Sequence, residues 1–102
     1  MTEVKTTGFK SFGPKTWLPQ LTVVVGTFGN EGRSNFTTAA WVGTSCSDPI
    51  ELSVSLRPMR LAHENIAKKR AFTVMVMGSE RAAEVDYCGM VGGREHDKAK
   101  DL

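Results

Sequence analysis

The first half of the chain alternates apolar and polar residues in short runs bounded by turn residues, a pattern that predicts β-strands. Residues 21–28 are rich in β-branched side chains and are apolar on both faces, which predicts a buried central strand. A second strand is expected over about 35–44. In residues 51–56, leucine and valine alternate with serine, which predicts a strand with one polar face. Pro58 ends this third strand, because proline has no backbone N–H to donate.

Turn residues separate these strands and predict an antiparallel meander. Two glycines and an asparagine within residues 29–32 tolerate a positive φ, which favours a tight hairpin turn. The Ser-Asp-Pro sequence at 47–49 predicts the next turn. Because three strands joined in this way are a natural start of a β-barrel, the expected fold class is mainly β.

The segment after the third strand predicts a short helix over residues 60–69. Ala62 and Ile66 lie four residues apart and would share one face of this helix. The basic run at 68–70 fits its C-terminal turn, where cations interact favourably with the helix dipole. A helix that starts just after the arginine of a strand end also brings amide donors and guanidinium groups together, which favours an anion.

The last part of the chain predicts a strand, a helix and a charged tail. Residues 71–77 are expected to form the fourth strand, with three side chains directed inward: Phe72, Val74 and Val76. Ser79 is expected to cap a helix that continues to about Tyr87. The charged segment 95–101 would ordinarily be solvated.

Length and composition indicate one small globular domain. The chain has 102 residues, of which 40% are hydrophobic, and its net charge of +2 is too small to suggest nucleic-acid binding. The sequence has no signal peptide and no apolar run long enough to cross a membrane, so a cytoplasmic protein is expected. Residues 1–16 are polar and predict an N-terminal arm, which leaves 17–102 for the domain.

The cysteines and histidines do not have the spacing of a metal site. Cys46 and Cys88 form no C-x-x-C pair, and His63 and His96 do not complete a zinc-ligand set. Cys88 has no resolving cysteine near it in the sequence, so we expect a packed helical thiol rather than a redox-active one.

Two stretches, 33–41 and 51–60, carry the candidate chemistry. The first has an asparagine and two threonines beside two alanines, and the second has two serines and two arginines. Hydroxyl, amide and guanidinium groups at neighbouring strand ends suit a phosphorylated ligand, and small residues would let a flat ring approach the backbone. The same residues can equally be solvated strand residues, because their spacing is not diagnostic by itself.

Several short motifs stand in order along the chain and together resemble a known family. They are Asn35-Phe-Thr-Thr-Ala-Ala-Trp41, Ser47-Asp-Pro49, Leu52-Ser-Val-Ser-Leu-Arg-Pro58, Arg60, His63, Asp86-Tyr-Cys-Gly89, Gly93-Arg94 and Asp97-Lys98. Their order resembles the flavin reductase-like family, and specifically its flavoredoxin-like branch. This resemblance implies an FMN-binding split β-barrel of antiparallel strands in meander or Greek-key order, with short helices. It also implies a homodimer with the flavin near the subunit interface.

The resemblance also implies a set of FMN-binding residues. Strand amides around Thr38 and Ala40 would face the polar edge of the ring, and Arg57, Arg60 and His63 would serve the phosphate. Only one of the two adjacent alanines can face the ring, because side chains alternate across a strand. The whole set is Asn35, Thr37, Thr38, Ala39, Ala40, Ser55, Leu56, Arg57, Arg60, His63 and Lys98. A solvated helix position remains the alternative for His63.

The function that the resemblance implies is electron transfer through bound FMN. The chain would be an NAD(P)H-linked flavin reductase-like oxidoreductase or a flavin electron carrier, with a nicotinamide nucleotide or a redox protein as partner. No catalytic side chain, metal, nucleic acid or membrane is implied, because the flavin performs the redox chemistry.

The sequence also departs from the family in ways that support another interpretation. The chain is shorter than family members, so the barrel is expected to be incomplete at its C-terminus, and Met59 and Ala62 stand where hydroxyl residues are common. The alternative function is therefore a non-catalytic, self-associating β-barrel fragment that has lost flavin. Open strand edges would favour a homodimer or larger oligomer in either case.

Overall fold

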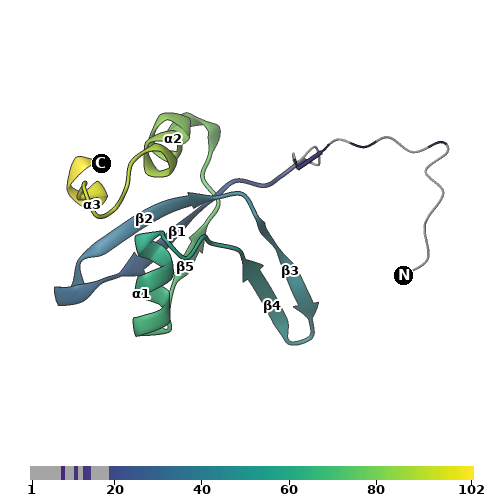
Figure 1. Cartoon of the computed structure of the whole chain (residues 1–102), viewed down its shortest axis with the longest axis horizontal. Coiled ribbons are helices and arrows are strands. Elements are labelled where there is room, and N and C mark those ends of the chain that lie inside the picture. Colours follow the sequence, from purple (N-terminus) through teal and green to yellow (C-terminus); the bar gives the residue numbers. More distant parts are fainter. Residues whose placement is uncertain (1–7, 9–10, 12, 15–18) are drawn as a thin grey trace.

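The computed structural model describes residues 8, 11, 13, 14 and 19–102 of the chain. Most of the predicted N-terminal arm, 1–16, lies outside the described residues. The described part contains two small antiparallel sheets and three α-helices (Figure 1). This arrangement confirms the predicted mainly β fold with short helices.

The larger sheet has the strand order β2-β1-β5. It consists of β1 (Val23–Phe28), β2 (Ser34–Ala39) and β5 (Thr73–Met75). β1 is the central strand and pairs antiparallel with both neighbours. Val23 and Val25 are 1% and 0% exposed, so the prediction of a buried central strand is confirmed.

A short 3-10 turn, η1 (Asn30–Gly32), joins β1 to β2. Glu31 and Gly32 have positive φ values of 59° and 71°, which close the hairpin tightly. The predicted hairpin is therefore confirmed, although the positive φ values fall on the last two residues of the turn. Gly32 adopts this conformation without the steric cost that a side chain would add.

The predicted second strand over 35–44 is wrong as a single element. β2 ends at Ala39, and a new strand, β3 (Val42–Ser47), begins after a break. The register explains the break, because Ala39 pairs with Val23 at the start of β1 and no partner residue of β1 remains beyond it.

The chain therefore pairs again, in a second sheet, with β4 (Ile50–Val54). Figure 1 shows this β3–β4 hairpin leading away from the three-stranded sheet. The predicted turn at 47–49 lies at its tip. The two segments that flank the hairpin stay together, because the Ser55 N–H donates to the Trp41 carbonyl at 2.9 Å.

The fourth predicted strand is shorter than the sequence suggested. Only Thr73–Met75 pairs with β1, and Val74 packs against the core as predicted. Phe72 and Val76 are 43% and 67% exposed, so their predicted inward position is wrong. Both lie outside the paired residues, where the sheet no longer holds the backbone.

The three helices are α1 (Leu61–Lys69), α2 (Ala82–Met90) and α3 (Lys98–Asp101). α1 ends at the basic run as predicted, and Arg70 follows with a left-handed φ of 53°. Ser79 does not cap α2, because a separate 3-10 turn, η2 (Ser79–Arg81), precedes that helix. The predicted cap is therefore wrong.

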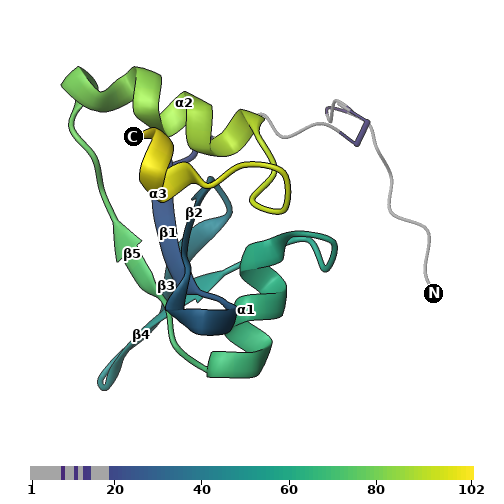
Figure 2. The same ribbon diagram turned by 90° about the vertical axis from the view of Figure 1, so that its left-hand side faces the viewer.

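α1 and α2 cover opposite faces of the three-stranded sheet, which lies between them in Figure 2. Asn65 of α1 binds Thr27 on the face that also carries Val23 and Val25. Thr38, on the alternate face of β2, donates to the Val85 carbonyl of α2. α3 lies against β2, so the outer side of this strand is held by the C-terminal segment.

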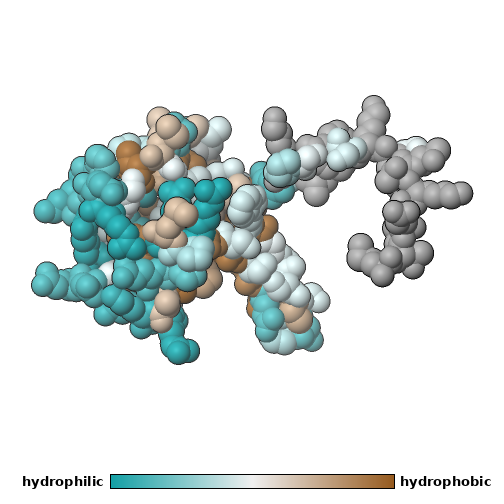
Figure 3. All heavy atoms as spheres, in the orientation of Figure 1, coloured by the Kyte–Doolittle hydropathy of each residue, from teal (hydrophilic) through white to brown (hydrophobic). Residues whose placement is uncertain are grey.

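Apolar packing is concentrated under α1 and at the base of the hairpin. Val23, Val25 and Ala39 form the buried cluster, with half-buried neighbours packed around it: Val42, Val54, Leu56, Ile66 and Val74. In Figure 3 the hairpin projects from the more hydrophilic body of the molecule. Its apolar side chains Ile50 and Leu52 are 76% and 52% exposed.

Candidate functional site

A groove lies where β2 ends and the hairpin returns toward α1. We call it the strand-end groove; residues 37–41, 55–57 and 60 line its volume of about 330 Å³. It therefore joins the two stretches that the sequence singled out. The bond from the Ser55 N–H to the Trp41 carbonyl holds its two walls together.

Most of the predicted site residues line this groove. They are Thr37, Thr38, Ala39, Ala40, Ser55, Leu56, Arg57 and Arg60. The other three predicted residues, Asn35, His63 and Lys98, lie elsewhere. The grouping follows from topology, because β2 leads directly into the hairpin and β4 leads back to the same point.

The two adjacent alanines have different surroundings. Ala39 is 7% exposed and belongs to the buried cluster with Val23 and Val25. Ala40 lies just beyond the end of β2 and is half-buried. The side chain of Ala39 thus faces the core. Ala40 is therefore the alanine whose side chain can face the strand-end groove.

A second groove adjoins the first, and we call it the cationic groove. Residues 37, 59–61, 92–95 and 98 line its volume of about 240 Å³. Thr37 and Arg60 line both grooves, so the two lie side by side. Arg60, Arg94 and Lys98 contribute three basic groups to it against one carboxylate from Glu95. This excess of positive charge suits an anionic group.

Lys98 is the most deeply buried basic residue of the site, with 2% of its surface exposed. Its Nζ donates to the carbonyl of Phe36 at 2.8 Å and to that of Cys88 at 2.9 Å. Burial lowers the pKa of Lys98, and the positive charge of Arg60 also lowers it. The prediction of a solvated charged tail is therefore wrong at this position, because β2 and α2 supply carbonyl partners.

Asn35 and His63 do not line either groove. Asn35 is 4% exposed and donates from Nδ2 to the Thr37 hydroxyl at 3.3 Å, which steadies a residue that both grooves share. His63 is exposed in the first turn of α1. Its backbone N–H donates to the Arg60 carbonyl at 3.1 Å.

The sequence did not identify the loop residues 92–95 as part of a site. Gly93 is buried, and a side chain there would overlap Asn35. Arg94 donates to Glu64 of α1 at 3.0 Å, and this hydrogen bond lowers the pKa of the Glu64 carboxyl. The Gly93-Arg94 motif was visible in the sequence, but its proximity to α1 depends on contacts between distant segments.

Cys88 is 2% exposed within α2, which confirms the expected packed position. Burial raises the pKa of its thiol, which disfavours the reactive thiolate. Among the described residues, no group of three or more histidine, cysteine, aspartate or glutamate side chains is placed to hold a metal ion. None of the helices in the described part is long and apolar enough to span a membrane.

The family model for the flavin reductase like domain matches residues 16–102. A comparison with curated proteins found no match.

The chain is also similar to solved structures of two flavoredoxins and an FMN-binding protein. The chain resembles the flavoredoxin of Desulfovibrio vulgaris (Miyazaki F), with 34% identity and a TM-score of 0.84, over 91% of this chain and 51% of that one. It resembles the flavoredoxin of Methanosarcina acetivorans with 27% identity and a TM-score of 0.81, over 88% and 48% of the two chains. An FMN-binding protein from Thermus thermophilus, solved with bound 1-cyclohex-2-enone, has 30% identity and a TM-score of 0.80, over 98% and 55%. The chain thus spans about half the length of these relatives.

Proposed function

The chain belongs to the flavin reductase-like family, and from this premise we propose that it binds FMN in the two adjoining grooves and transfers electrons through the flavin. The observation that carries the proposal is that Thr37 and Arg60 line both grooves. A ligand with a flat ring and a negatively charged group could therefore occupy both at once. Two flavoredoxins and an FMN-binding protein among the similar structures support this choice of ligand.

The strand-end groove fits the ring. Ala40 adds little bulk beside it, and Leu56 offers half-buried apolar surface. β2 is an edge strand, and its outer side keeps backbone donors and acceptors that β1 does not use. These groups and the Ser55 hydroxyl can bind the polar edge of the flavin.

The cationic groove fits the phosphate. Arg60 stands between the grooves, and Arg57 lines the strand-end groove beside it. The Lys98 ammonium has three N–H donors, of which two bind carbonyls of the described protein. Its third donor and the Arg60 guanidinium would hold a phosphate by charge-assisted hydrogen bonds. Asn35 would act through the Thr37 hydroxyl, and His63 stays a candidate at the start of α1.

A bound flavin would supply the redox chemistry, and the residues of this chain would bind it and exclude water. No protein nucleophile or general base is needed for that role. The electron donor or acceptor would be a nicotinamide nucleotide or a redox protein. The enzyme activity that we propose is that of a flavin reductase-like oxidoreductase.

A second candidate function is a self-associating domain that no longer binds flavin. Met59 favours it, because this apolar side chain lines the cationic groove where a hydroxyl would bind phosphate better. The visible absorbance spectrum of the desalted protein separates the two candidates. Retained flavin absorbance, or quenching of FMN fluorescence on titration, supports the flavoprotein; the absence of both contradicts it.

We also propose that the protein is a homodimer or larger homo-oligomer. The exposed Ile50 and Leu52 of the hairpin, and the outer edge of β5, offer surface for a second copy. Light scattering at micromolar concentration tests this, and a monodisperse monomer would contradict it.

A further inference from the structure

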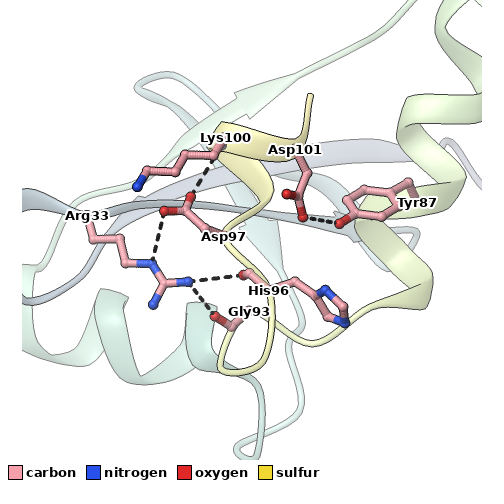
Figure 4. Close-up of polar contacts among 7 residues, drawn as sticks. All are labelled: Arg33, Tyr87, Gly93, His96, Asp97, Lys100 and Asp101. Carbon is pink, nitrogen blue, oxygen red and sulfur yellow. Dashed lines mark hydrogen bonds and ion pairs between the residues drawn. The ribbon is translucent and has the colours of Figure 1, made fainter.

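Arg33 lies immediately before β2 and contacts the loop of residues 93–97, which precedes Lys98 (Figure 4). Its Nη2 donates to the carbonyl of Gly93 at 3.3 Å and to that of His96 at 3.1 Å. Its Nε lies 3.8 Å from the carboxylate of Asp97. One guanidinium therefore binds the loop near its beginning and at its end, immediately before Lys98.

Arg33 is itself held by backbone hydrogen bonds to the turn between β1 and β2, which it follows directly. Its carbonyl accepts a hydrogen bond from the Gly29 N–H at 2.8 Å, and its N–H donates to the Asn30 carbonyl at 3.2 Å. Because the Arg33 side chain is 45% exposed, its ion pair with Asp97 should contribute little by itself. The two carbonyl contacts, both made by Nη2, are the part that restricts the loop.

The partner of this contact, Asp97, also organises α3. Its side chain accepts a hydrogen bond from the Lys100 N–H at 3.3 Å and caps the helix. Lys98 follows Asp97 directly and bridges Phe36 of β2 and Cys88 of α2. The position of Lys98 at the cationic groove thus depends on where Arg33 holds the residue before it.

We infer that Arg33 is a positioning residue that holds the 93–97 loop so that Lys98 presents its remaining N–H to the anionic group of the ligand. This inference rests on the proposed FMN site and deepens it, because it assigns part of the selection for a phosphorylated flavin to a residue outside both grooves. Arg33 lines neither groove, so its effect must pass through the residues of the loop that it holds, and the inference assigns it to Lys98.

The first test needs no flavin and measures how fast a lysine-reactive acetylating reagent modifies Lys98, by mass spectrometry. Lys100, exposed in the same helix, is the internal reference. Arg33→Ala should raise the rate at Lys98 on the order of ten-fold, because local opening exposes the ammonium. Arg81→Ala is the charge-matched control, since it removes a 54% exposed side chain that is ion-paired within its own segment. Equal protection of Lys98 in all three proteins would overturn the inference.

The second test compares FMN with riboflavin, which lacks the phosphate. Arg33→Ala should weaken FMN binding roughly three- to ten-fold and leave riboflavin affinity unchanged, the range for residues that act through a neighbour. Equal loss for both flavins would indicate a merely structural role and overturn the inference. If the parent protein binds neither flavin, the proposed function fails, and the acetylation rates still decide whether Arg33 positions Lys98.

A double-mutant cycle tests the route of the effect. In a Lys98→Met background, Arg33→Ala should cause no further loss of FMN affinity, because the group that it positions is absent. Additive losses would overturn the inference, since Arg33 would then act on FMN independently of Lys98.

Discussion

Lys98 donates from Nζ to the backbone carbonyl of Phe36 at 2.8 Å, a contact between residues 62 positions apart. It attaches the short helix α3 to the edge strand β2. Lys98 also lines the cationic groove beside Arg60. One residue therefore both holds α3 on β2 and contributes to the basic lining of the proposed ligand site.

Replacing the groove arginines tests the proposed phosphate site. Arg60→Ala should weaken FMN binding by about 1.5–3 kcal/mol, the range for a hydrogen bond to a charged group. Arg57→Ala should have a smaller effect, because Arg57 is exposed and lines only the strand-end groove. Quenching of FMN fluorescence measures both affinities. Unchanged affinity in both variants would contradict the phosphate assignment.

Valine at each of the two adjacent alanines tests which one faces the ring. Ala39→Val should cost about 1–3 kcal/mol of stability by overpacking, because Ala39 lies in the buried cluster. Ala40→Val should preserve stability and reduce flavin content, since its added methyl groups would occupy the strand-end groove. Thermal unfolding and flavin absorbance measure the two effects. Parent-like flavin binding in both variants would place the ring away from this strand.

Local pattern was sufficient to predict the elements whose neighbours are close in sequence. The β-branched run of β1 required burial on both faces, and the alternation in 51–56 predicted β4 to within a few residues. Alternation also implied that Ala39 and Ala40 face opposite ways. It could not decide which one faces the core, because that depends on the register of β2 against Val23.

The remaining features depend on contacts between distant segments. The break after Ala39 occurs because β1 has no residue left to pair with. The apolar and polar residues of 35–44 cannot predict where β1 begins. The tail around Lys98 is hydrophilic, yet carbonyls of Phe36 and Cys88 make its burial possible. Residues 92–95 join the site because residues far away in the sequence, among them Arg33 and Glu64, bind that loop.

Adding a methyl group at Gly93 tests how closely the loop packs on β2. An ideal Cβ there would overlap the Asn35 carboxamide and lie 3.0 Å from Leu61 Cδ2. Gly93→Ala should therefore destabilise the protein by about 1–3 kcal/mol, as overpacking does. Gly43→Ala is the matched control, because no neighbouring atom lies within 4 Å of its ideal Cβ. Equal urea midpoints for the two variants would show that the loop is loosely packed.

Titration of Tyr87 tests how α3 is held at its other end. The Tyr87 hydroxyl donates to the Asp101 carboxylate (Figure 4). That hydrogen bond raises the pKa of Tyr87 from 10.0 to about 12. Because the pKa is raised in the folded state, the hydrogen bond of the neutral hydroxyl contributes its full stabilisation below pH 10.0. That contribution is lost as the pH rises through about 12.

Tyr87 is the only tyrosine among the 102 residues, so the ultraviolet absorbance of tyrosinate reports this group alone. In the parent protein the transition should be centred near 12, and Asp101→Ala should return it toward 10.0, because both the acceptor and its charge are removed. Tyr87→Phe removes the signal and should abolish the pH-dependent loss of stability between those values. If the parent and Asp101→Ala titrate together, the hydroxyl does not bind Asp101 in solution, and this end of α3 is not held by Tyr87.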